Sequence, residues 1–543
     1  MSAAIKAKYD VVILGAGHNG LVAAAYLARA GLDVLLLEKN DYIGGATTSQ
    51  RIFPDYEASL SRYSYLVSLL PEKIIRDLGL QLELRTRETA SFTPYRRNGK
   101  HDGLLLSNLS ESVGRKSLME LTGGDAEFTQ LQRFYRLGRV LAEEVWDTML
   151  EPLRAKDEVA RQFAQDDFKR EAWRSIVEEP LGCAIERHLE DDLVRGLVFT
   201  DAKIGLLTHP HDGTLLQNRC FIYHVIGNRT GEWKVPVGGM GRVADELIRV
   251  AHGAGAKMLT RVQVRCLHFS TQARSVEFEV GEHTHTVDAR FVLVNFGTNV
   301  LAGLLGRAYQ PGSTHEGSVL KINMLLQRLP GLRASRHAAR EAFCGTFHIN
   351  EGYEQMKASH QRAAQGHLPS TIPCEMYCHT LTDNSILSPE LRERGFHTLT
   401  LFAMDTPWRL FRDDNQAARR EAAERCLAGL NGWLAEPVED CLARSRAGEP
   451  CIECKSPVDI ENELGHYRGN IFHSALTFPF AECAAMVGSW GVETEFERVY
   501  ICGSSAQRGG AVSGIPGHNA AMKVLQALSR SSPRRRGIRG QPG

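Results

Sequence analysis

The fold is decided by residues 10–45, which read DVVILGAGHNGLVAAAYLARAGLDVLLLEKNDYIGG. Residues 10–14 form an aliphatic, largely β-branched run, as expected for a buried strand of a parallel sheet. Three glycines follow, and LVAAAYLARA then places apolar residues at helical spacing. Gly31 stands where a helix C-terminus favours glycine, and residues 33–37 are a second aliphatic run that ends at Glu38. The order strand, helix, strand predicts a βαβ unit.

Each glycine of the motif GAGHNG has its own task. Gly15 permits the tight turn after the strand, Gly17 lets the backbone approach a pyrophosphate, and Gly20 lets the helix pack closely on the strand. The helix N-terminus would present free N–H groups to that pyrophosphate. Glu38, which lies 18 residues after Gly20, is expected to accept hydrogen bonds from ribose hydroxyls and to repel a 2′-phosphate. The stretch therefore predicts a dinucleotide site that disfavours NADP.

The residues after Glu38 favour FAD over NAD. They read KNDYIGGATTS, so that a double glycine, Gly44 and Gly45, begins six residues beyond the acid. Two glycines let the backbone run close to a cofactor without obstruction by a Cβ atom. The arrangement resembles an extension of FAD enzymes related to amine oxidases and carotenoid desaturases, which NAD-binding folds generally lack; an ordinary glycine turn is the alternative. We expect Lys39, Gly44 and Gly45 to belong to an FAD site.

A second glycine-rich segment lies near the C-terminus. Residues 498–503 (RVYICG) predict a short strand, and SSAQRGGAVSGIPGHNAA leads from it to a helix between about Pro516 and Leu528. With the N-terminal unit, this segment indicates the second half of a flavin clamp, and a helix start without a ligand is the alternative. The glycines expected at the cofactor are Gly503, Gly509, Gly510 and Gly514.

Residues 233–264 supply further material for the first sheet. The sequence VGGMG opens an amphipathic helix, which Gly253 and Gly255 end. Strands are expected at 257–264 and at 291–295 (FVLVN), and both are predicted to return to the same parallel sheet. GGMG is not a second dinucleotide fingerprint, because no buried strand ends immediately before it. A built-in NAD(P)H domain is therefore not expected.

Together, GAGHNG, E-x5-GG, VPVGGMG and GSSAQRGGAVSGIPGHNAA resemble the phytoene-dehydrogenase-like FAD oxidoreductases, which include carotenoid desaturases, ketolases and isomerases. The resemblance spans nearly the whole chain except its tail. It implies that the first glycine motif and Glu38 hold the ADP part of FAD, that Gly44 and Gly45 pass near the flavin side, and that the backbone of Val262 contacts the adenine. The glycines implied beside the isoalloxazine are Gly509, Gly510 and Gly514.

Two residues depart from this family pattern. Ala46 stands where desaturases often carry Arg after the double glycine, so contacts at the flavin ring are expected to differ. Ala511 stands where a third glycine is common, which predicts a mild narrowing beside the ring.

Several inner segments, among them TDAKIGLLTHPH at 200–211 and GNIFH at 469–473, resemble one branch of the family that is named for pyridine nucleotide-disulfide oxidoreductases. A redox disulfide is nevertheless not expected. True disulfide reductases place a C-x4-C pair soon after the first βαβ unit, whereas residues 46–182 contain no cysteine. A dithiol mechanism is therefore not predicted.

The predicted fold class is α/β, with a Rossmann-type FAD-binding domain of the amine oxidase and phytoene desaturase kind and an interleaved α+β substrate domain. The FAD-binding domain is expected to combine residues 1–80, 230–300 and 490–529. Residues 81–229 and 301–489 would form the substrate domain.

Within the substrate domain, strands are expected at 319–329 and 396–404 and a helix at 415–434. Residues 126–153 carry an apolar stripe at helical spacing, which is more typical of a core face than of a substrate groove. The stripe consists of Phe128, Leu131, Phe134, Leu137, Leu141, Val145 and Met149.

Few residues are required for catalysis, because flavin N5 accepts a hydride itself and the protein need supply only position, dryness and one base. His473 in GNIFH either faces the flavin or is a hydrogen-bonded structural histidine. Lys321, in an otherwise apolar strand, either steers a water towards N5 or is a snorkelling or ion-paired lysine. Asp201 and His348 are further candidates.

No metal site is predicted, because His209 and His211 beside Asp212 lack a further cluster of ligands. The twelve cysteines are scattered, without a second pair at zinc-ribbon spacing, so we expect reduced thiols.

The 64 basic and 64 acidic residues balance, so no overall field attracts nucleic acid, and no nucleic-acid partner is expected. The chain has neither a secretory signal nor an apolar run long enough to span a bilayer, which predicts a cytoplasmic protein, or one of an organelle matrix in a eukaryote. The basic tail, residues 530–543, is expected to be disordered. A solvated tail is favoured, and peripheral contact with a membrane is the alternative.

The leading functional hypothesis is an FAD-dependent dehydrogenase or desaturase that acts on a small apolar, polyene- or isoprenoid-like substrate. This substrate class rests on the resemblance, since a fold does not fix a function. A flavin amine oxidase is the second hypothesis, and a non-catalytic flavoprotein that binds a partner is the third. A redox-neutral isomerase that uses reduced flavin is a variant of the first.

Overall fold

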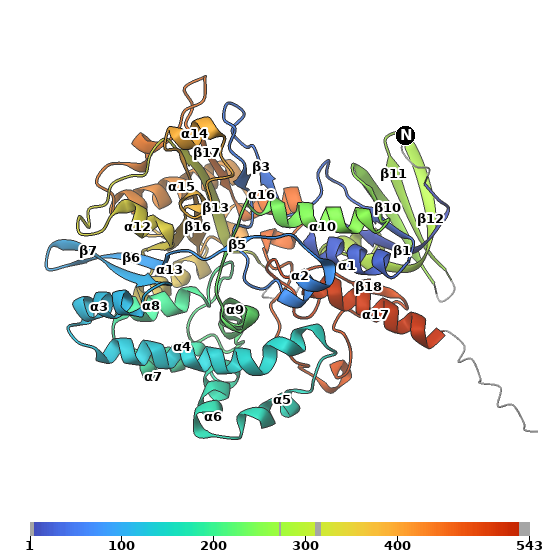
Figure 1. Ribbon diagram of the computed structural model, residues 1–543, viewed down its shortest axis with the longest axis horizontal. Coiled ribbons are helices and arrows are strands. Elements are labelled where there is room, and N and C mark those ends of the chain that lie inside the picture. The colour runs from blue at the N-terminus through green and yellow to red at the C-terminus, as the bar shows by residue number, and fades with distance from the viewer. Residues whose placement is uncertain (1–4, 271–272, 310–315, 532–543) are drawn as a thin grey trace, which may run out of the picture.

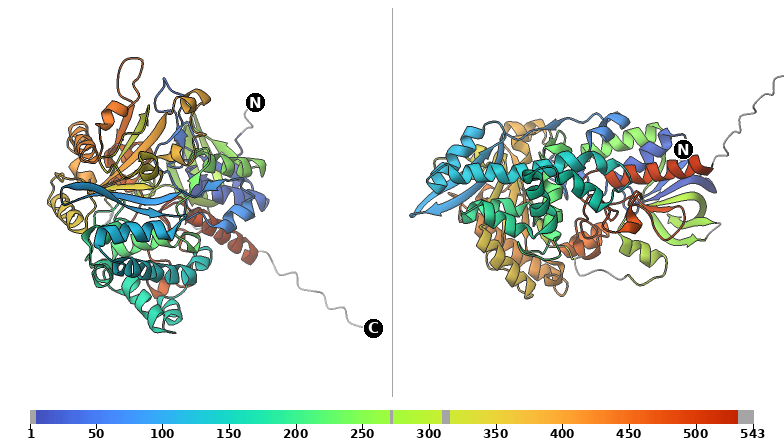
Figure 2. Two further views of the ribbon diagram at one scale, coloured as in Figure 1. Left: turned by 60° about the vertical axis from the view of Figure 1, so that its left-hand side comes forward. Right: turned by 90° about the horizontal axis from the view of Figure 1, so that it is seen from below.

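The structure, a computed structural model, describes residues 5–270, 273–309 and 316–531. Two large sheets lie towards opposite ends of an elongated molecule, and helices cover both of them (Figure 1). Figure 2 shows the same separation from below, with the C-terminal helix alongside the N-terminal part of the chain. Of the basic tail predicted at 530–543, residues 532–543 lie outside the described residues.

The first sheet has seven strands among the described residues and is built around β1 (Lys8–Leu14). β1 pairs in parallel with β2 (Val34–Leu37) on one side and β12 (His283–Val294) on the other. In turn, β2 pairs in parallel with β9 (Lys257–Leu259), and β12 with β18 (Val499–Ile501). The predicted βαβ unit is confirmed, and strands from three distant parts of the chain end at one edge of the sheet.

Three helices pack together against this sheet: α1 (His18–Arg29), α10 (Gly241–Gly253) and α17 (Ile515–Ser531). The start of α17 packs directly against the start of α1. A Cβ atom added to Gly517 would lie only 2.1 Å from the carbonyl oxygen of Asn19. The two glycine-bearing helix starts predicted from the sequence are therefore neighbours in space.

The single strand predicted at 257–264 is wrong, because the chain forms two strands there. β9 ends at Leu259, Arg261 adopts a φ of +57°, and β10 (Val262–Phe269) departs in a new direction. β10 then pairs with β11 (Arg274–Val280), which pairs with the first half of β12, in an antiparallel meander. The turn uses a non-glycine residue in the left-handed region, which residue type alone does not mark.

The second sheet also has seven strands among the described residues, in the order β17-β13-β16-β15-β14-β6-β7. Neighbouring strands are antiparallel except for the parallel pair β14 and β6. The strands are β6 (Thr89–Arg97), β7 (Lys100–Ser107), β13 (Val319–Leu326), β14 (Thr346–Ile349), β15 (Cys374–Tyr377), β16 (His397–Met404) and β17 (Ile452–Lys455).

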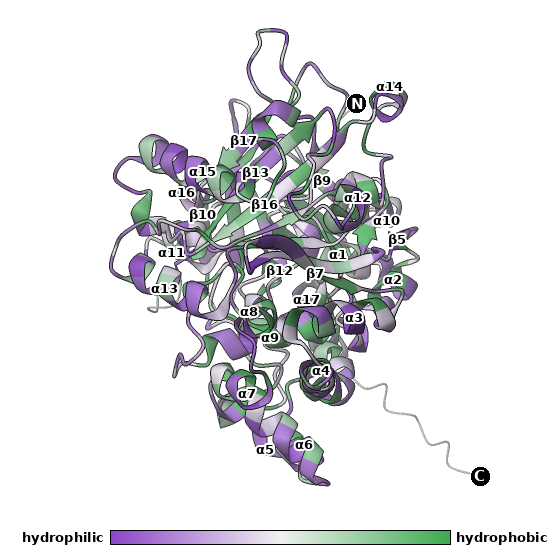
Figure 3. Ribbon diagram, turned by 90° about the vertical axis from the view of Figure 1, so that its left-hand side faces the viewer, coloured by the Kyte–Doolittle hydropathy of each residue, from purple (hydrophilic) through white to green (hydrophobic). Residues whose placement is uncertain are grey.

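β13 and β16 confirm the strands predicted at 319–329 and 396–404, and α15 (Asn415–Asn431) confirms the helix predicted at 415–434. Figure 3 shows hydrophobic colour on the inner strands β13 and β16, whereas the outer helices α13 (Tyr353–Ala364) and α15 carry hydrophilic residues. Every residue of β13 is buried, which places this strand in the core.

A group of helices packs below the second sheet (Figure 1). The predicted apolar stripe lies on α4 (Ala126–Val145) and the following η1 (Trp146–Leu150), and all seven of its residues are at most 5% exposed. The stripe is therefore a core face, as predicted. The other helices of this group are α3 (Glu111–Thr122), α5 (Lys156–Phe163), α6 (Asp167–Trp173), η2 (Arg174–Glu178), α7 (Leu181–His188), α8 (Asp192–Thr200), α9 (Leu216–Val225) and η3 (Gly227–Arg229).

Shorter elements connect these parts. The helical ones are α2 (Glu72–Leu78), α11 (Thr298–Leu304), α12 (Ala339–Cys344), η4 (His379–Leu381), α14 (Pro389–Glu393), η5 (Trp408–Leu410), η6 (Val438–Cys441), α16 (Pro457–Leu464), η7 (Tyr467–Gly469) and η8 (Ala484–Met486). The remaining strands are β3 (Ser49–Gln50), β4 (Leu60–Ser61), β5 (Leu84–Arg85) and β8 (Val235–Pro236). All twelve cysteines are free thiols. Over the described ranges, each helix is too short or too polar to traverse a lipid bilayer.

Candidate functional site

One cavity of about 700 Å³ connects the first sheet to the second. At the first sheet it reaches the surface beside the exposed residues Lys39 and Gln263. At the other end it reaches the surface beside Asn108 and Thr230, which are also exposed. Of the residues predicted to form the site, those that line this cavity are Gly15, Gly17, Glu38, Lys39, Gly45, Val262, Lys321 and His473.

The first glycine loop lies at the carboxyl ends of β1 and β12. Gly15 has a φ of +96°, a conformation that favours glycine, and Gly17 is the N-cap residue of α1. Gly20 leaves no room for a side chain, because an added Cβ atom would lie 2.6 Å from the carbonyl oxygen of Gly15. Asn295, at the end of β12, fixes the loop: its Nδ2 donates to the carbonyls of Gly15 (3.0 Å) and Gly17 (3.3 Å).

Glu38 is 5% exposed, and its carboxylate joins two loops at the cavity wall. Oε2 accepts a hydrogen bond from the N–H of Ala16 (2.7 Å), and Oε1 accepts one from the N–H of Asn40 (2.9 Å). Val262 lines the cavity, but its N–H donates to the carbonyl of Glu38 (2.9 Å). The Val262 N–H is therefore not free to bond an adenine. The backbone contact that the family resemblance implies would have to use other backbone atoms of Val262.

The double glycine packs on the first glycine loop. The N–H of Gly44 donates to the carbonyl of Ala16 (2.9 Å), and Gly44 bridges Gly17 in parallel. An added Cβ atom would lie 2.7 Å from the carbonyl of Thr47 at Gly44 and 3.2 Å from the Cα of Gly17 at Gly45. Gly45 lines the cavity, whereas Gly44 lies behind it.

The C-terminal segment contributes Ser504, Ala511 and Val512 to the cavity wall. The predicted glycines lie behind these residues and shape the backbone: Gly503 packs against Asn295, Gly509 against Ser504, Gly510 against Leu476 and Gly514 against Val22.

Ala511 has a φ of +50°, where a glycine would be unstrained.

Arg508 holds the C-terminal segment to the helical part of the chain, since its guanidinium donates to the carbonyls of Thr148, Glu151 and Trp490 at 2.8 to 3.1 Å. Burial lowers the pKa of Arg508 to about 10.

Three histidines line the cavity between the two glycine segments: His466, which is buried, and His18 and His473, which are half-buried. The rings of His466 and His473 lie 3.9 Å apart, and Nδ1 of His18 hydrogen-bonds with Oγ1 of Thr47 (3.0 Å). Burial lowers the pKa of His18 and of His473 to about 4, so both are neutral at pH 7. Within the described residues, Nε2 of His18 and Nδ1 of His466 and His473 find no hydrogen-bond partner. The hydrogen-bonded structural role considered for His473 is thus not what the structure shows.

Lys321 projects from β13 into the cavity and is 2% exposed. Its Nζ donates to the carbonyls of Ser61 (2.9 Å) and Tyr63 (2.8 Å), and no carboxylate of the described residues forms an ion pair with it. Burial holds the pKa of Lys321 well below its usual value. The two carbonyls take two of the three hydrogen-bonding positions around Nζ, and one position remains. Lys321 is therefore neither a snorkelling nor an ion-paired lysine.

Asp201 and His348, noted from the sequence as further candidates, line the far end of the same cavity with Arg87 and Glu375. Burial raises the pKa of Asp201 to about 6 and that of Glu375 to about 7. Sequence reasoning missed Arg87 and Glu375, as it missed Asn295, His18 and His466. Of these, only Asn295, which follows the buried run FVLV, has a local signal: a polar residue at the carboxyl end of a parallel strand.

His209 and His211 contact different partners. The ring of His209 lies against that of His360, with centroids 5.0 Å apart and planes tilted by 48°, and Nε2 of His211 pairs with Glu186 (2.8 Å). Across the parts of the chain that the structure describes, no group of three or more His, Cys, Asp or Glu side chains is arranged to hold a metal ion.

The residues present fit an FAD. A glycine loop without room for side chains faces the cavity beside a buried carboxylate, and unpartnered imidazole nitrogens lie where acceptor oxygens of a dinucleotide would satisfy them. The profile of a family described as flavin containing amine oxidoreductase matches residues 20–440. This chain belongs to that family. Membership confirms the FAD cofactor and the FAD-dependent oxidoreductase fold predicted from the sequence.

Relatives of known sequence extend over nearly the whole chain. An uncharacterized protein of Mycobacterium tuberculosis is 44% identical over 533 residues, covering 97% of this chain and 99% of the relative. Pyridine nucleotide-disulfide oxidoreductase domain-containing protein 2 of Mus musculus is 28% identical over 569 residues, covering 96% and 94%. A component of the limonene dehydrogenase of Castellaniella defragrans is 22% identical over 558 residues, covering 96% and 95%.

Solved structures support the fold. Cyclohexylamine oxidase from Brevibacterium oxydans superposes with a TM-score of 0.55 at 15% identity, covering 96% of this chain and all of that one.

Sequence matches to a phytoene desaturase of Neurospora crassa and a carotenoid 3,4-desaturase of Haloarcula japonica cover only 22% and 51% of this chain. The comparisons therefore support the broad family of FAD oxidoreductases rather than the phytoene-dehydrogenase group expected from the sequence.

Proposed function

We propose that this flavin oxidoreductase dehydrogenates a mainly apolar, isoprenoid-like substrate, which loses a hydride to the cofactor and a proton to water. The observation that carries the proposal is the continuous main cavity, which extends from the glycine loops into a chamber with a largely apolar wall. Side chains of this wall are Leu66, Leu69, Leu106, Leu197, Ile204, Val319, Phe402, Ile471 and Phe472. The full-length relative that is named as part of a limonene dehydrogenase supports the same substrate class.

For the cofactor, we propose that Gly15 and Gly17 approach the pyrophosphate and that the remaining lone pairs of Glu38 accept hydrogen bonds from the ribose. The glycines that do not line the cavity would act indirectly, by allowing the loops around it to pack. They are Gly20, Gly44, Gly503, Gly509, Gly510 and Gly514. Ala511 and Val512, rather than the neighbouring glycines, would then lie beside the flavin.

Bound FAD supplies the hydride acceptor. The role proposed for Lys321 is to hold a water in the cavity, because the two carbonyls take only two of the three hydrogen-bonding positions around Nζ. His473 is neutral at pH 7 and would donate or accept one hydrogen bond towards the cofactor without bringing a charge. Catalytic assignments are thus proposed for Lys321 and His473.

Oxidation of an amine is the second candidate function, and a specific observation favours it. Asp201 and Glu375 present carboxyl groups to the cavity, and carboxylates attract an ammonium group. A non-catalytic flavoprotein that binds a partner is the third candidate function. Flavin reduction distinguishes it from the other two.

The experiment is anaerobic mixing of the purified holoenzyme with two substrate panels, isoprenoids and primary amines, with flavin bleaching as the readout. The proposal expects bleaching by isoprenoids and not by amines. The reverse result would establish the amine candidate, and a flavin that no donor of either panel reduces would favour the non-catalytic role. Lys321→Met is expected to keep its FAD and to slow bleaching about 100-fold. The flavin of Lys357→Met, in which a partly exposed lysine of α13 is replaced, should be reduced at the wild-type rate.

A further inference from the structure

The far end of the cavity contains four ionisable side chains, here called the distal polar cluster: Arg87, Asp201, His348 and Glu375. They come from four separate segments. Arg87 precedes β6, Asp201 caps α8, and His348 and Glu375 stand directly opposite each other on β14 and β15. Cross-strand neighbours project from the same face of a sheet, so His348 and Glu375 face the cavity together.

Each member of the cluster keeps hydrogen-bonding capacity that the protein does not use. Oε1 of Glu375 accepts from the hydroxyls of Tyr377 (2.7 Å) and Tyr65 (3.1 Å), whereas Oε2 receives no hydrogen bond from a described residue. Nδ1 of His348 pairs with Glu351 (2.7 Å), which leaves Nε2.

The two remaining members, Asp201 and Arg87, have even fewer of their hydrogen-bonding positions filled. The carboxylate of Asp201 has no hydrogen bond within the described part of the chain. The guanidinium of Arg87 donates from Nη1 to Oγ1 of Thr346 (2.9 Å), but its Nε is fully buried without a partner among the described residues. Buried polar groups are nearly always paired, so four underused groups that share one cavity indicate a ligand.

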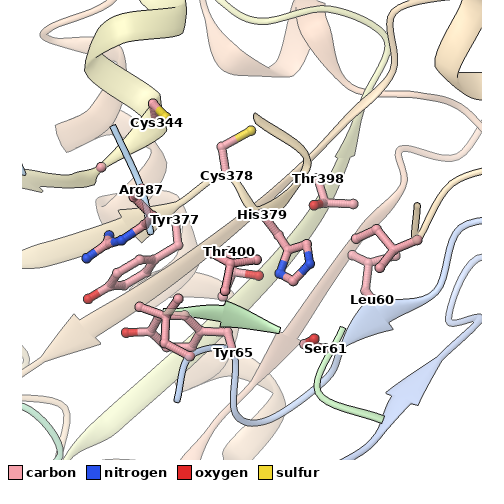
Figure 4. A pocket seen from close by; sticks show the side chains of 14 residues that line it. Leu60, Ser61, Tyr65, Arg87, Cys344, Tyr377, Cys378, His379, Thr398 and Thr400 are labelled. Carbon is pink, nitrogen blue, oxygen red and sulfur yellow. The ribbon is translucent and has the colours of Figure 1, made fainter. Parts of the chain in front are cut away.

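Arg87 is 9% exposed and is positioned by aromatic rings. Its guanidinium lies 5.6 Å from the centre of the Tyr377 ring, which packs on Tyr65 with centroids 4.0 Å apart. Figure 4 shows Arg87 beside Tyr377 and Tyr65, at the wall that the main cavity shares with a small cavity of about 20 Å³. Tyr65 also contacts Phe402, over which Nζ of Lys321 lies at 4.9 Å. One layer of aromatic rings therefore separates the cluster from Lys321.

The charges of the cluster offset one another. Two members are acidic and two are basic, and Asp201 lies within electrostatic reach of both His348 and Arg87. Behind the cavity wall, the buried Glu351 pairs with His348 and adds a third carboxyl group. A charged ammonium or carboxylate group bound here would lie close to a group of the same charge, which would repel it. A hydroxyl group, which both donates and accepts, matches acceptors on Asp201 and Glu375 and donors on Arg87 and His348 without adding charge.

We propose that the distal polar cluster binds a hydroxyl group at one end of an otherwise apolar substrate and so fixes which carbon reaches the flavin. The proposal rests on the proposed function in that it places the apolar part of the substrate between the cluster and the cofactor. The cluster residues are positioning residues, since an aromatic layer separates them from the reacting end.

The test is titration of the holoenzyme with matched C10, C15 and C20 isoprenoids as hydrocarbon, alcohol and primary amine, followed through the absorbance of the bound flavin. The wild type should bind the alcohols at least about tenfold more tightly than the hydrocarbons, the effect of one hydrogen bond to a charged group. Asp201→Asn and Glu375→Gln should bring this ratio close to one at unchanged FAD content. Asp212→Asn, on the same segment as Asp201 but outside the cavity lining, should keep it.

Equal or tighter binding of hydrocarbons, tighter binding of amines, no binding in any series, or a ratio that survives in both variants would overturn the proposal. Bleaching is recorded in the same titrations and separates the two hypotheses. Alcohol preference without bleaching contradicts the proposed function and leaves the recognition intact, whereas bleaching without alcohol preference does the opposite.

Discussion

Replacement of Glu38 by glutamine tests the N-terminal cofactor site most sharply. The carboxylate accepts hydrogen bonds from two backbone N–H groups, of Ala16 and Asn40, and thereby holds both loops at the cavity wall. A glutamine retains one oxygen, so one buried N–H must face the amide NH₂ group and lose its acceptor. A hydrogen bond to a charged group contributes about 1.5–3 kcal/mol.

In Glu38→Gln that loss falls on the loop proposed to hold the cofactor, and the acceptor proposed for the ribose is weakened as well. The dissociation constant for FAD is therefore expected to rise by about 10- to 150-fold. The assay is fluorescence titration of deflavinated protein with FAD, with circular dichroism as a check that the variant is folded.

Glu127→Gln is the matched control. The buried carboxylate of Glu127 also accepts from two backbone N–H groups, but it does not line the cavity. Its Oε1 accepts from both Glu190 and Asp191 (3.0 Å each), and Oε2 accepts a second, longer bond from Glu190 (3.2 Å). Because a glutamine keeps one oxygen for both N–H groups, Glu127→Gln should lower stability less than Glu38→Gln and leave FAD affinity unchanged. The reasoning is refuted if Glu38→Gln binds FAD as the wild type does, or if Glu127→Gln weakens FAD binding equally.

Three further changes have expected results. Ala511→Gly removes a left-handed alanine (φ +50°) and should stabilise the holoenzyme by about 1 kcal/mol in thermal unfolding; a loss of stability would contradict the strain argument. Arg508→Met leaves three carbonyls without their donor and should destabilise by more than about 3 kcal/mol, whereas unchanged denaturant unfolding would show that the anchor is dispensable. Because burial raises the pKa of Glu375 to about 7, the folded protein binds a proton that the unfolded chain has lost, and its contribution to stability falls as pH rises from about 4.5 to 7. Glu375→Gln should gain up to about 3 kcal/mol over the wild type across that window, and a constant difference between pH 4.5 and 8 would sink the assignment.

The arrangement of the candidate cofactor half of the site could be predicted because its geometry is local. Gly15, Gly17, Gly20 and Glu38 belong to one βαβ unit, in which spacing along the chain fixes position in space. The strand break at Arg261 could not be predicted, since the apolar pattern continues across it and the turn uses no glycine.

The substrate half depends on pairings that no local pattern encodes. His348 and Glu375 meet only through the register of β14 and β15, and Arg87 and Asp201 join them from other segments. Asn295 and Arg508 likewise act on residues hundreds of positions away. Apart from the position of Asn295 at the end of a buried strand, these residues have no signature in the sequence, because their function arises from the tertiary arrangement.

The central claim is that the first glycine loop forms part of a site for one FAD. The most direct measurement is the flavin-to-protein ratio of purified wild type, Gly17→Val and Gly253→Val. Valine at position 17 would press its Cβ to 3.1 Å from Asn295 at the loop itself, whereas nothing lies within 4 Å of a Cβ atom at the exposed Gly253. We expect one FAD per chain in the wild type and in Gly253→Val and almost none in Gly17→Val. A colourless wild type that takes up no added FAD, or a fully loaded Gly17→Val, would contradict the account.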